Sequence, residues 1–275
     1  MCTHFIICYS TMSQGNLKSV CTTKQVYLYL NTAKRTSGTN TNAKFAANNQ
    51  QWGQDRMFNF RVRQLYIPNE FFNVYKGANT IELSQGFNRV AITITPGRYS
   101  STELLNEFKT NLLDTINVNV EHVQANGNRI TWTFDQVIVI HGQNVPDSLT
   151  DSLGRTFGFP LNNDVIFNQG EPSGPYSLML NRPNLIKVFL DLVEDNTVDN
   201  DKLTSLLDTI SLDSTEYGSA VSRYYDQGSN ISFDFPELRH LNSFTIRLTD
   251  QFDIPLEMPE NFEVSLFLVL GLNSV

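Results

Sequence analysis

Hydrophobic and polar positions alternate along several short segments of the chain, as in strands that bury one face. The clearest example is 58–67, where apolar and polar side chains follow one another with a period of two. The last segment, 262–270, is apolar on both faces toward its end, which indicates a central, covered strand. Further strand patterns lie at 25–30, 185–193, 231–235 and 244–249. This many strands with long connections predict a mainly β protein built as an antiparallel jelly-roll sandwich.

One segment follows the helical period instead. Apolar residues recur from Leu104 to Ile116, and a Ser or Thr at 100–102 with Glu103 suits a helix start. Hairpin patterns flank this helix at 80–95 and 118–134, each with a turn containing glycine. We therefore predict a ββαββ insertion at about 78–142, with the helix burying its apolar stripe against the sheet.

The remaining segments set the expected domain boundaries. Residues 1–23 are interpreted as an N-terminal arm and 24–275 as a single jelly-roll domain, interrupted by the insertion. The polar stretch 31–55 shows no period and is predicted to be a long loop. A short helix is expected at 149–153, and 201–210 is expected to be either a helical insertion or a loop. No internal repeat is evident, which excludes a propeller or solenoid.

Composition supports a folded β protein. Of 275 residues, 40% are hydrophobic and only 17% charged, with 19 Phe and 10 Tyr, so a disordered chain is excluded. No apolar run reaches the roughly 18 residues of a membrane span. The apolar start at 1–9 has no preceding Lys or Arg, so we expect no secretory signal, and 1–11 are either native or an alternative-start extension before Met12. The three cysteines, Cys2, Cys8 and Cys21, fit a reducing compartment.

Charge is divided unevenly along the chain. The net charge is −8, yet 1–130 carries 13 Lys and Arg against 7 Asp and Glu, whereas 131–275 is strongly acidic. Such a division is typical of a nucleic-acid-facing arm or of a polar subunit that packs against copies of itself, although a solvated basic loop is an equal alternative. The basic residues expected to make arm or assembly contacts are Lys18, Lys24, Lys34, Arg35, Lys44 and Arg56.

Catalytic and metal-binding patterns are sparse. The four histidines have no HxH or HExxH spacing. His122 and His141 lie in predicted strands, where they either converge with Asp135 or Glu121 or, as we favour, are ordinary strand histidines. The acidic stretch 194–201 lacks the central glycine and final glutamate of a calcium loop and is interpreted as solvated. We therefore predict no enzyme activity, no metal and no cofactor.

Three passages carry a resemblance to a known family. They are the turn and helix start Pro96-Gly-Arg-Tyr-Ser-Ser-Thr-Glu-Leu-Leu-Asn106, the segment Leu153-Gly-Arg-Thr-Phe-Gly-Phe159, and the closing strand pair 244–250 and 262–270. Together they resemble single jelly-roll penton and minor capsid proteins of eukaryotic double-stranded DNA viruses, as found in virophages, polinton-like viruses and nucleocytoplasmic large DNA viruses.

This resemblance implies a structural protein of the virion, made in the cytoplasm or nucleus of the host cell. It would be either a penton forming a homopentamer at the vertices or a minor protein cementing major capsid capsomers. The expected partners are copies of the chain, the major capsid protein and other minor capsid proteins; nucleic-acid contact through the basic arm is a further possibility. The alternative is a receptor- or glycan-binding module of a spike or fibre, using Trp52, Tyr66 and Trp132.

Overall fold

The computed structural model describes two compact units of the chain. Unit 1 comprises the described residues of Met1–Glu70, Ile186–Leu248 and Met258–Val275, and unit 2 those of Phe71–Leu185 and Thr249–Glu257. The described residues are 23–46, 56–76, 79–125, 129–142, 153–160, 163–180, 183–192, 197–199, 202–212, 215–225, 232–239, 243–251 and 253–273.

The first sheet of unit 1 has five strands in the part of the chain that is described. Its order is β1 (Thr23–Asn31), β19 (Ser265–Asn273), β4 (Arg56–Pro68) and β16 (Ala220–Tyr224), and β17 (Ser232–Arg239) also pairs with β4. Leu30, Leu266 and Leu65 share one row of this sheet and are all buried. The last strand is central, as predicted, and Leu268, Val269 and Leu270 are covered on both faces.

The second sheet of unit 1 runs β15 (Leu206–Ser211), β12 (Leu185–Leu190), β18 (Ser243–Thr249), β3 (Asn42–Ala46) and β2 (Ser37–Gly38). Phe45 of β3 and Phe244 of β18 are paired in register and stack with ring centroids 5.3 Å apart. Both antiparallel sheets bury apolar side chains, as in a β-sandwich. The mainly β, antiparallel class is therefore confirmed.

Two predicted connections are wrong. The stretch 31–55 is not a loop throughout, because it contains the 3-10 helix η1 (Thr32–Lys34) and strands β2 and β3; 47–55 lies outside the described residues. The stretch 201–210 is neither helix nor loop, since β14 (Lys202–Thr204) pairs with β13 (Thr197–Asp199) and β15 follows. The side-chain period alone does not predict these strands, and their pairing with other strands identifies them.

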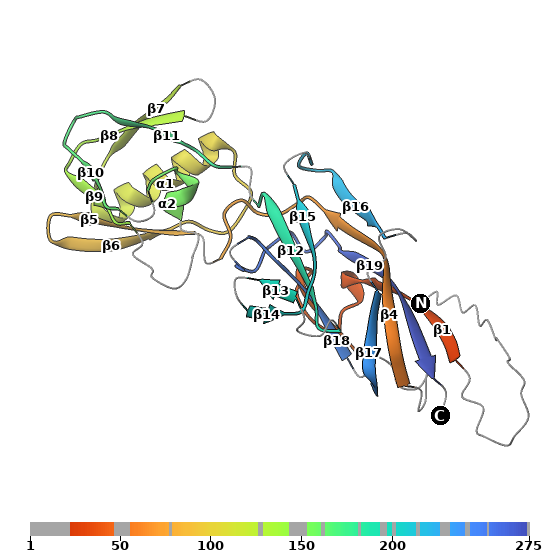
Figure 1. Ribbon diagram of the computed structural model, residues 1–275. Helices are drawn as coiled ribbons and strands as arrows, with labels where there is room; N and C mark the ends of the chain where they lie inside the picture. The colour runs from red at the N-terminus through yellow and green to blue at the C-terminus, as the bar shows by residue number, and fades with distance from the viewer. Residues whose placement is uncertain are drawn as a thin grey trace, which may run out of the picture. The chain divides into compact units, whose positions relative to one another are not determined.

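Unit 2 places a helix between two sheets, as Figure 1 shows. One sheet has the order β10 (Val165–Phe167), β9 (Ile138–Ile140), β5 (Thr80–Gln85) and β6 (Asn88–Thr93). The other has the order β11 (Ser173–Ser177), β8 (Arg129–Phe134) and β7 (Val120–Ala125). The two predicted hairpins and the helix between them are thus present as elements. Their interpretation as an insertion at 78–142 stays a prediction, and unit 2 is longer than that range.

Helix α1 (Ser101–Ile116) begins as its sequence predicts. The Ser100 hydroxyl accepts a hydrogen bond from the Glu103 amide, and the Glu103 side chain accepts one from the Ser100 amide, which together form a capping box. Asn117 ends the helix in the left-handed conformation at φ 52°. The apolar stripe is buried, with Phe108 packed edge-on against Trp132 at 5.6 Å between ring centroids. A short helix, α2 (Leu153–Thr156), shares only Leu153 with the helix predicted at 149–153; 149–152 lie outside the described residues, so that helix stays a prediction.

Candidate functional site

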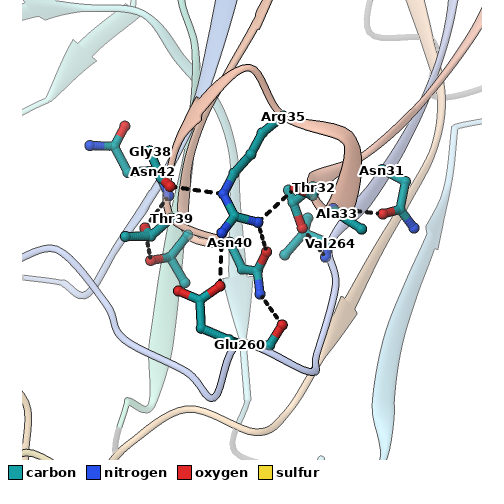
Figure 2. Close-up of polar contacts among 11 residues, drawn as sticks. Asn31, Thr32, Ala33, Arg35, Gly38, Thr39, Asn40, Asn42, Glu260 and Val264 are labelled. Atoms are coloured by element: carbon teal, nitrogen blue, oxygen red, sulfur yellow. Dashed lines mark hydrogen bonds and ion pairs between the residues drawn. The ribbon is translucent and has the colours of Figure 1, made fainter.

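A polar network centred on Arg35 fixes one end of unit 1 (Figure 2). The guanidinium donates to the carbonyl oxygens of Gly38 and Thr32, at 2.8 and 2.9 Å, and to Asn40 Oδ1 at 2.7 Å. It also pairs with Glu260 at 2.8 Å. Arg35 suits this position because its planar fork supplies several donors at fixed angles. Its charge is therefore used to hold the 260–264 loop against η1.

Further hydrogen bonds attach the same loop to the end of β1. The Asn40 side-chain amide donates to the Glu260 carbonyl at 3.0 Å. The Thr32 amide donates to the Val264 carbonyl at 2.9 Å, and the Val264 amide donates to the Thr32 hydroxyl at 3.0 Å. Asn31 caps η1 by accepting from the Ala33 amide at 2.8 Å. The loop is therefore held by backbone as well as side-chain bonds (Figure 2).

A groove of about 640 Å³ lies on unit 1 beside this network. Its floor is the outer face of the first sheet, because strand register places Tyr29, Phe267 and Gln64 in one row. The next row holds Asn31, Ser265 and Tyr66. Tyr29 and Tyr66 are 64% and 39% exposed, so their rings are available on the surface. We call this feature, with its 14 lining residues, the sheet groove.

Two loops form the walls of the sheet groove. Phe262 and Glu263 belong to the loop held by Arg35, and Glu263 accepts from the Asn31 side chain at 2.7 Å. Gly218 belongs to the opposite wall, where its φ of +83° requires glycine. The Gly218 amide donates to the Asn69 carbonyl at 3.2 Å, which fixes this turn against the end of β4.

Glu70 is the most buried charged group in the sheet groove, at 8% exposure. No hydrogen bond or ion pair of its carboxylate is found among the described residues. Its carboxylate oxygens remain accessible to solvent in the groove, where they can accept hydrogen bonds from a ligand. No Lys or Arg is among the described residues lining the groove. The site combines aromatic rings, amides and carboxylates, and it offers no counter-ion for an anion.

The predicted basic contacts do not form one patch. Lys18 lies outside the described residues. Lys24 and Arg56 lie toward the same end of the first sheet, opposite Leu272 and Asn273 of β19. Lys34 and Arg35 follow the other end of β1, and Lys44 lies in β3 of the second sheet. Whether any of them contacts a partner stays a prediction.

The three predicted glycan-contacting aromatics have different environments. Trp132 is wholly buried in the core of unit 2, so its assignment as a surface contact is wrong; it packs against α1 and Phe157. Trp52 lies outside the described residues. Tyr66 does line the sheet groove. Sequence analysis missed Tyr29 and Phe267, which only strand register places beside Tyr66, and Glu70, which lies just beyond the end of β4.

The histidines do not converge with the predicted carboxylates. His141 instead lies between Ser84, with Oγ 2.5 Å from Nε2, and Asp164, with Oδ2 3.2 Å from Nδ1. The Gly142 amide and the His141 side chain hold the pKa of Asp164 below its usual value. Asp135 accepts from Asn119. Burial and then the charge of Lys109 lower the pKa of His122.

The Ser84, His141 and Asp164 side chains follow one another in the order of a catalytic triad. Ser84, however, lies inside β5, and its backbone is paired with Arg89 on one side and Val139 on the other. The backbone amides around Ser84 are therefore used in strand pairing, and they are not available to stabilise an oxyanion. Within the described part of the chain, no group of His, Cys, Asp and Glu is arranged to hold a metal. No described helix has both the length and the apolar character to span a bilayer.

Comparison with solved structures finds distant likenesses to this chain. No protein-family model and no curated protein matches the chain. A crystal structure of selenomethionine-labelled mavirus penton protein is similar, with a TM-score of 0.41 and 10% sequence identity over 90% of this chain and 99% of that chain.

Proposed function

We propose that unit 1 is a jelly roll and that the chain is a structural protein of a viral capsid, as a penton or a minor capsid protein. The observation that carries the proposal is the pairing order of the strands in unit 1. Eight strand positions occur in chain order as β1, β3, β4, β12, β15, the β16–β17 pair, β18 and β19. The first pairs with the eighth, the second with the seventh, the third with the sixth and the fourth with the fifth.

This order describes one long hairpin rolled up into two sheets. The strands then alternate between the sheets as 1-8-3-6 and 2-7-4-5, which is the arrangement that a jelly roll requires. Unit 2 leaves this framework between the third and fourth strands and again between the seventh and eighth. Both segments of unit 2 leave the pairing of the eight strands unchanged.

The step from fold to function is made by analogy, because jelly rolls occur in viral capsids and also in lectins. The three sequence passages that resemble penton and minor capsid proteins favour the capsid. An enzyme is not favoured, because the described residues hold no site with both an activated nucleophile and free oxyanion donors. The proposed partners are therefore further copies of the chain and the major capsid protein.

The test is the size and shape of the purified full-length chain. Mass photometry and negative-stain imaging are expected to show rings, and five-fold rings would support a penton. Another closed oligomer, or a stable complex with a co-expressed major capsid protein, would support a minor capsid protein. A chain that stays monomeric at high concentration and does not bind the capsid protein would contradict the proposal.

A further inference from the structure

We infer that the sheet groove of unit 1 is a binding site for a neutral carbohydrate. This activity is independent of assembly, since every group that carries the argument belongs to one chain and one unit. The volume of about 640 Å³ is within the range of about 300–1,000 Å³ typical of small-ligand sites. Such a volume accommodates a short stretch of sugar residues.

Aromatic side chains supply the apolar part of the site. Tyr29 and Tyr66 come from β1 and β4, on either side of the central strand β19, which contributes Phe267. The Tyr29 side chain is fixed in position, because its hydroxyl donates to Ser265 Oγ at 3.0 Å. Exposed rings fixed on a rigid sheet form a platform for the C–H faces of a sugar at little cost in conformational entropy.

Amide and carboxylate side chains supply the polar part. Gln64 and Asn31 lie in the two neighbouring rows of the floor, and Glu70 and Glu263 lie at the edges. Glu70 contributes a carboxylate that has no protein partner among the described residues and whose oxygens remain accessible in the groove. A sugar hydroxyl can donate to this carboxylate, and a hydrogen bond to a charged acceptor is about twice as strong as one between neutral groups.

The charge of the groove selects the class of sugar. Glu70 and Glu263 are both acidic, and no Lys or Arg is among the described lining residues. Sialic acid and sulfated sugars would place a negative charge against these carboxylates with no counter-ion. A neutral glycan meets no such repulsion, and its hydroxyls donate to carboxylate oxygens.

The Arg35 network fixes the loop that forms one wall of the sheet groove. Arg35 and Asn40 hold Glu260, and Thr32 holds Val264, so the segment carrying Phe262 and Glu263 is fixed at both ends (Figure 2). Arg35 is thus a positioning residue that need not touch the ligand. Fixing this loop before binding lowers the entropic cost of closing it around a sugar.

The test is binding of the full-length chain to an array of neutral, sialylated and sulfated glycans, followed by titration of the best neutral oligosaccharide. Tyr66→Ala is expected to weaken binding by about tenfold, and Glu70→Gln, which keeps the shape of the side chain, by about ten- to a hundredfold. Phe87→Ala is the control, because Phe87 is a fully exposed aromatic side chain of unit 2 and does not line the groove. This control is expected to bind as the unchanged chain does.

Three results would overturn the inference. They are the absence of binding to any neutral glycan, binding confined to sialylated or sulfated glycans, and unchanged binding by both Tyr66→Ala and Glu70→Gln. Circular dichroism of each variant establishes that it is folded. If the two groove variants lower the oligomer mass while the unchanged chain binds no glycan, the groove is occupied by a second copy and the inference fails. Because glycan binding and oligomer mass are separate measurements, this failure is distinct from failure of the capsid proposal.

Discussion

At the scale of single residues, polar side chains such as Arg35 make hydrogen bonds that hold the local structure of unit 1 together. Arg35 was predicted to be an assembly contact, yet its guanidinium satisfies two carbonyl oxygens, an amide oxygen and a carboxylate within unit 1. A buried or half-buried carbonyl that loses its donor costs more free energy than an exposed ion pair returns. The contribution of Arg35 is therefore to the free energy of unfolding.

Replacing Arg35 is expected to destabilise unit 1. Arg35→Ala leaves several acceptors without a donor and should lower the free energy of unfolding by about 1–3 kcal/mol in urea denaturation. Arg35→Lys should recover little of the lost free energy of unfolding, because an ammonium group does not reproduce the planar arrangement of donors in the guanidinium. Glu260→Gln is the control: the Glu260 side chain is 70% exposed, and its loss should cost only about 0–1 kcal/mol. An equal cost for both would show that the ion pair, and not the backbone bonds, is decisive.

Trp132 is expected to be essential for the core of unit 2. Trp132→Ala should lower the free energy of unfolding by about 3–5 kcal/mol, because it leaves a cavity among Phe108, Phe157 and Phe159. Trp132→Phe should cost much less, because it keeps a ring and removes an indole N–H that has no acceptor among the described residues. Thermal unfolding of the two variants measures the difference. Similar stability of the alanine variant and the unchanged chain would contradict a buried position.

Ser84 is expected to be unreactive despite its hydrogen bond to His141. Its backbone is paired on both sides, so the neighbouring amides are not available to stabilise an oxyanion. A fluorophosphonate probe, read by intact-protein mass spectrometry, should therefore leave the chain unlabelled. Labelling that disappears in both Ser84→Ala and His141→Ala would reveal an activated nucleophile and reverse this expectation.

At the scale of elements, local signals predict what a segment becomes but not what it pairs with. Helix α1 has a start signal, an apolar stripe and an end residue within its own sequence, and each is found in place. The hairpin of β5 and β6 likewise depends on neighbouring residues. By contrast, β2, β3 and β15 are identified as strands by their pairing, β2 with β3, β3 with β18 and β15 with β12.

The capping box of α1 is expected to respond to pH. Hydrogen bonds from the backbone and then the side chain of Ser100 hold the pKa of Glu103 below its ordinary value. A lowered folded-state pKa means that this stabilisation is present above the unfolded-state pKa of about 4.3 and is lost as the pH falls through the folded-state pKa.

Two variants distinguish the effect of the Glu103 charge on stability from the effect of the Ser100 N-cap. Glu103→Gln should be less stable than the unchanged chain at pH 7, and the difference should shrink on acidification below about pH 4.3. Ser100→Ala should cost about 0.5–2 kcal/mol through loss of the N-cap. Thermal unfolding across pH measures both effects. A difference between the glutamine variant and the unchanged chain that grows toward low pH would contradict the assigned sign.

At the scale of the whole molecule, folding mixes the two charge halves of the sequence. Strand β19 of the acidic half lies between β1 and β4 of the basic half, and Glu260 of the acidic half pairs with Arg35. Some oppositely charged residues of the two halves therefore pair within unit 1. The charge that remains unpaired is available to contacts between chains, as the proposed capsid role requires.

Assembly of the chain is expected to weaken at high salt. Raising the ionic strength from about 0.15 M to 1 M shortens the screening length from about 8 Å to 3 Å, which weakens attraction between exposed opposite charges. Mass photometry across this range should show a rising dissociation constant of the oligomer. Sucrose, which does not screen charge, serves as the control for solvent effects. An oligomer whose dissociation constant does not change with salt would show that the asymmetry plays no part in assembly.

The sequence alone determined the mainly β class, the central last strand, and the helix with its flanking hairpins. These properties depend on the side-chain period and on start and end signals, which act over a few neighbouring residues. Only the tertiary structure decided the strand pairing, the burial of Trp132 and the position of the sheet groove. The groove joins residues as distant as Asn31 and Glu263, which are 232 positions apart. Such contacts depend on strand register across the whole chain, and no local pattern specifies that register.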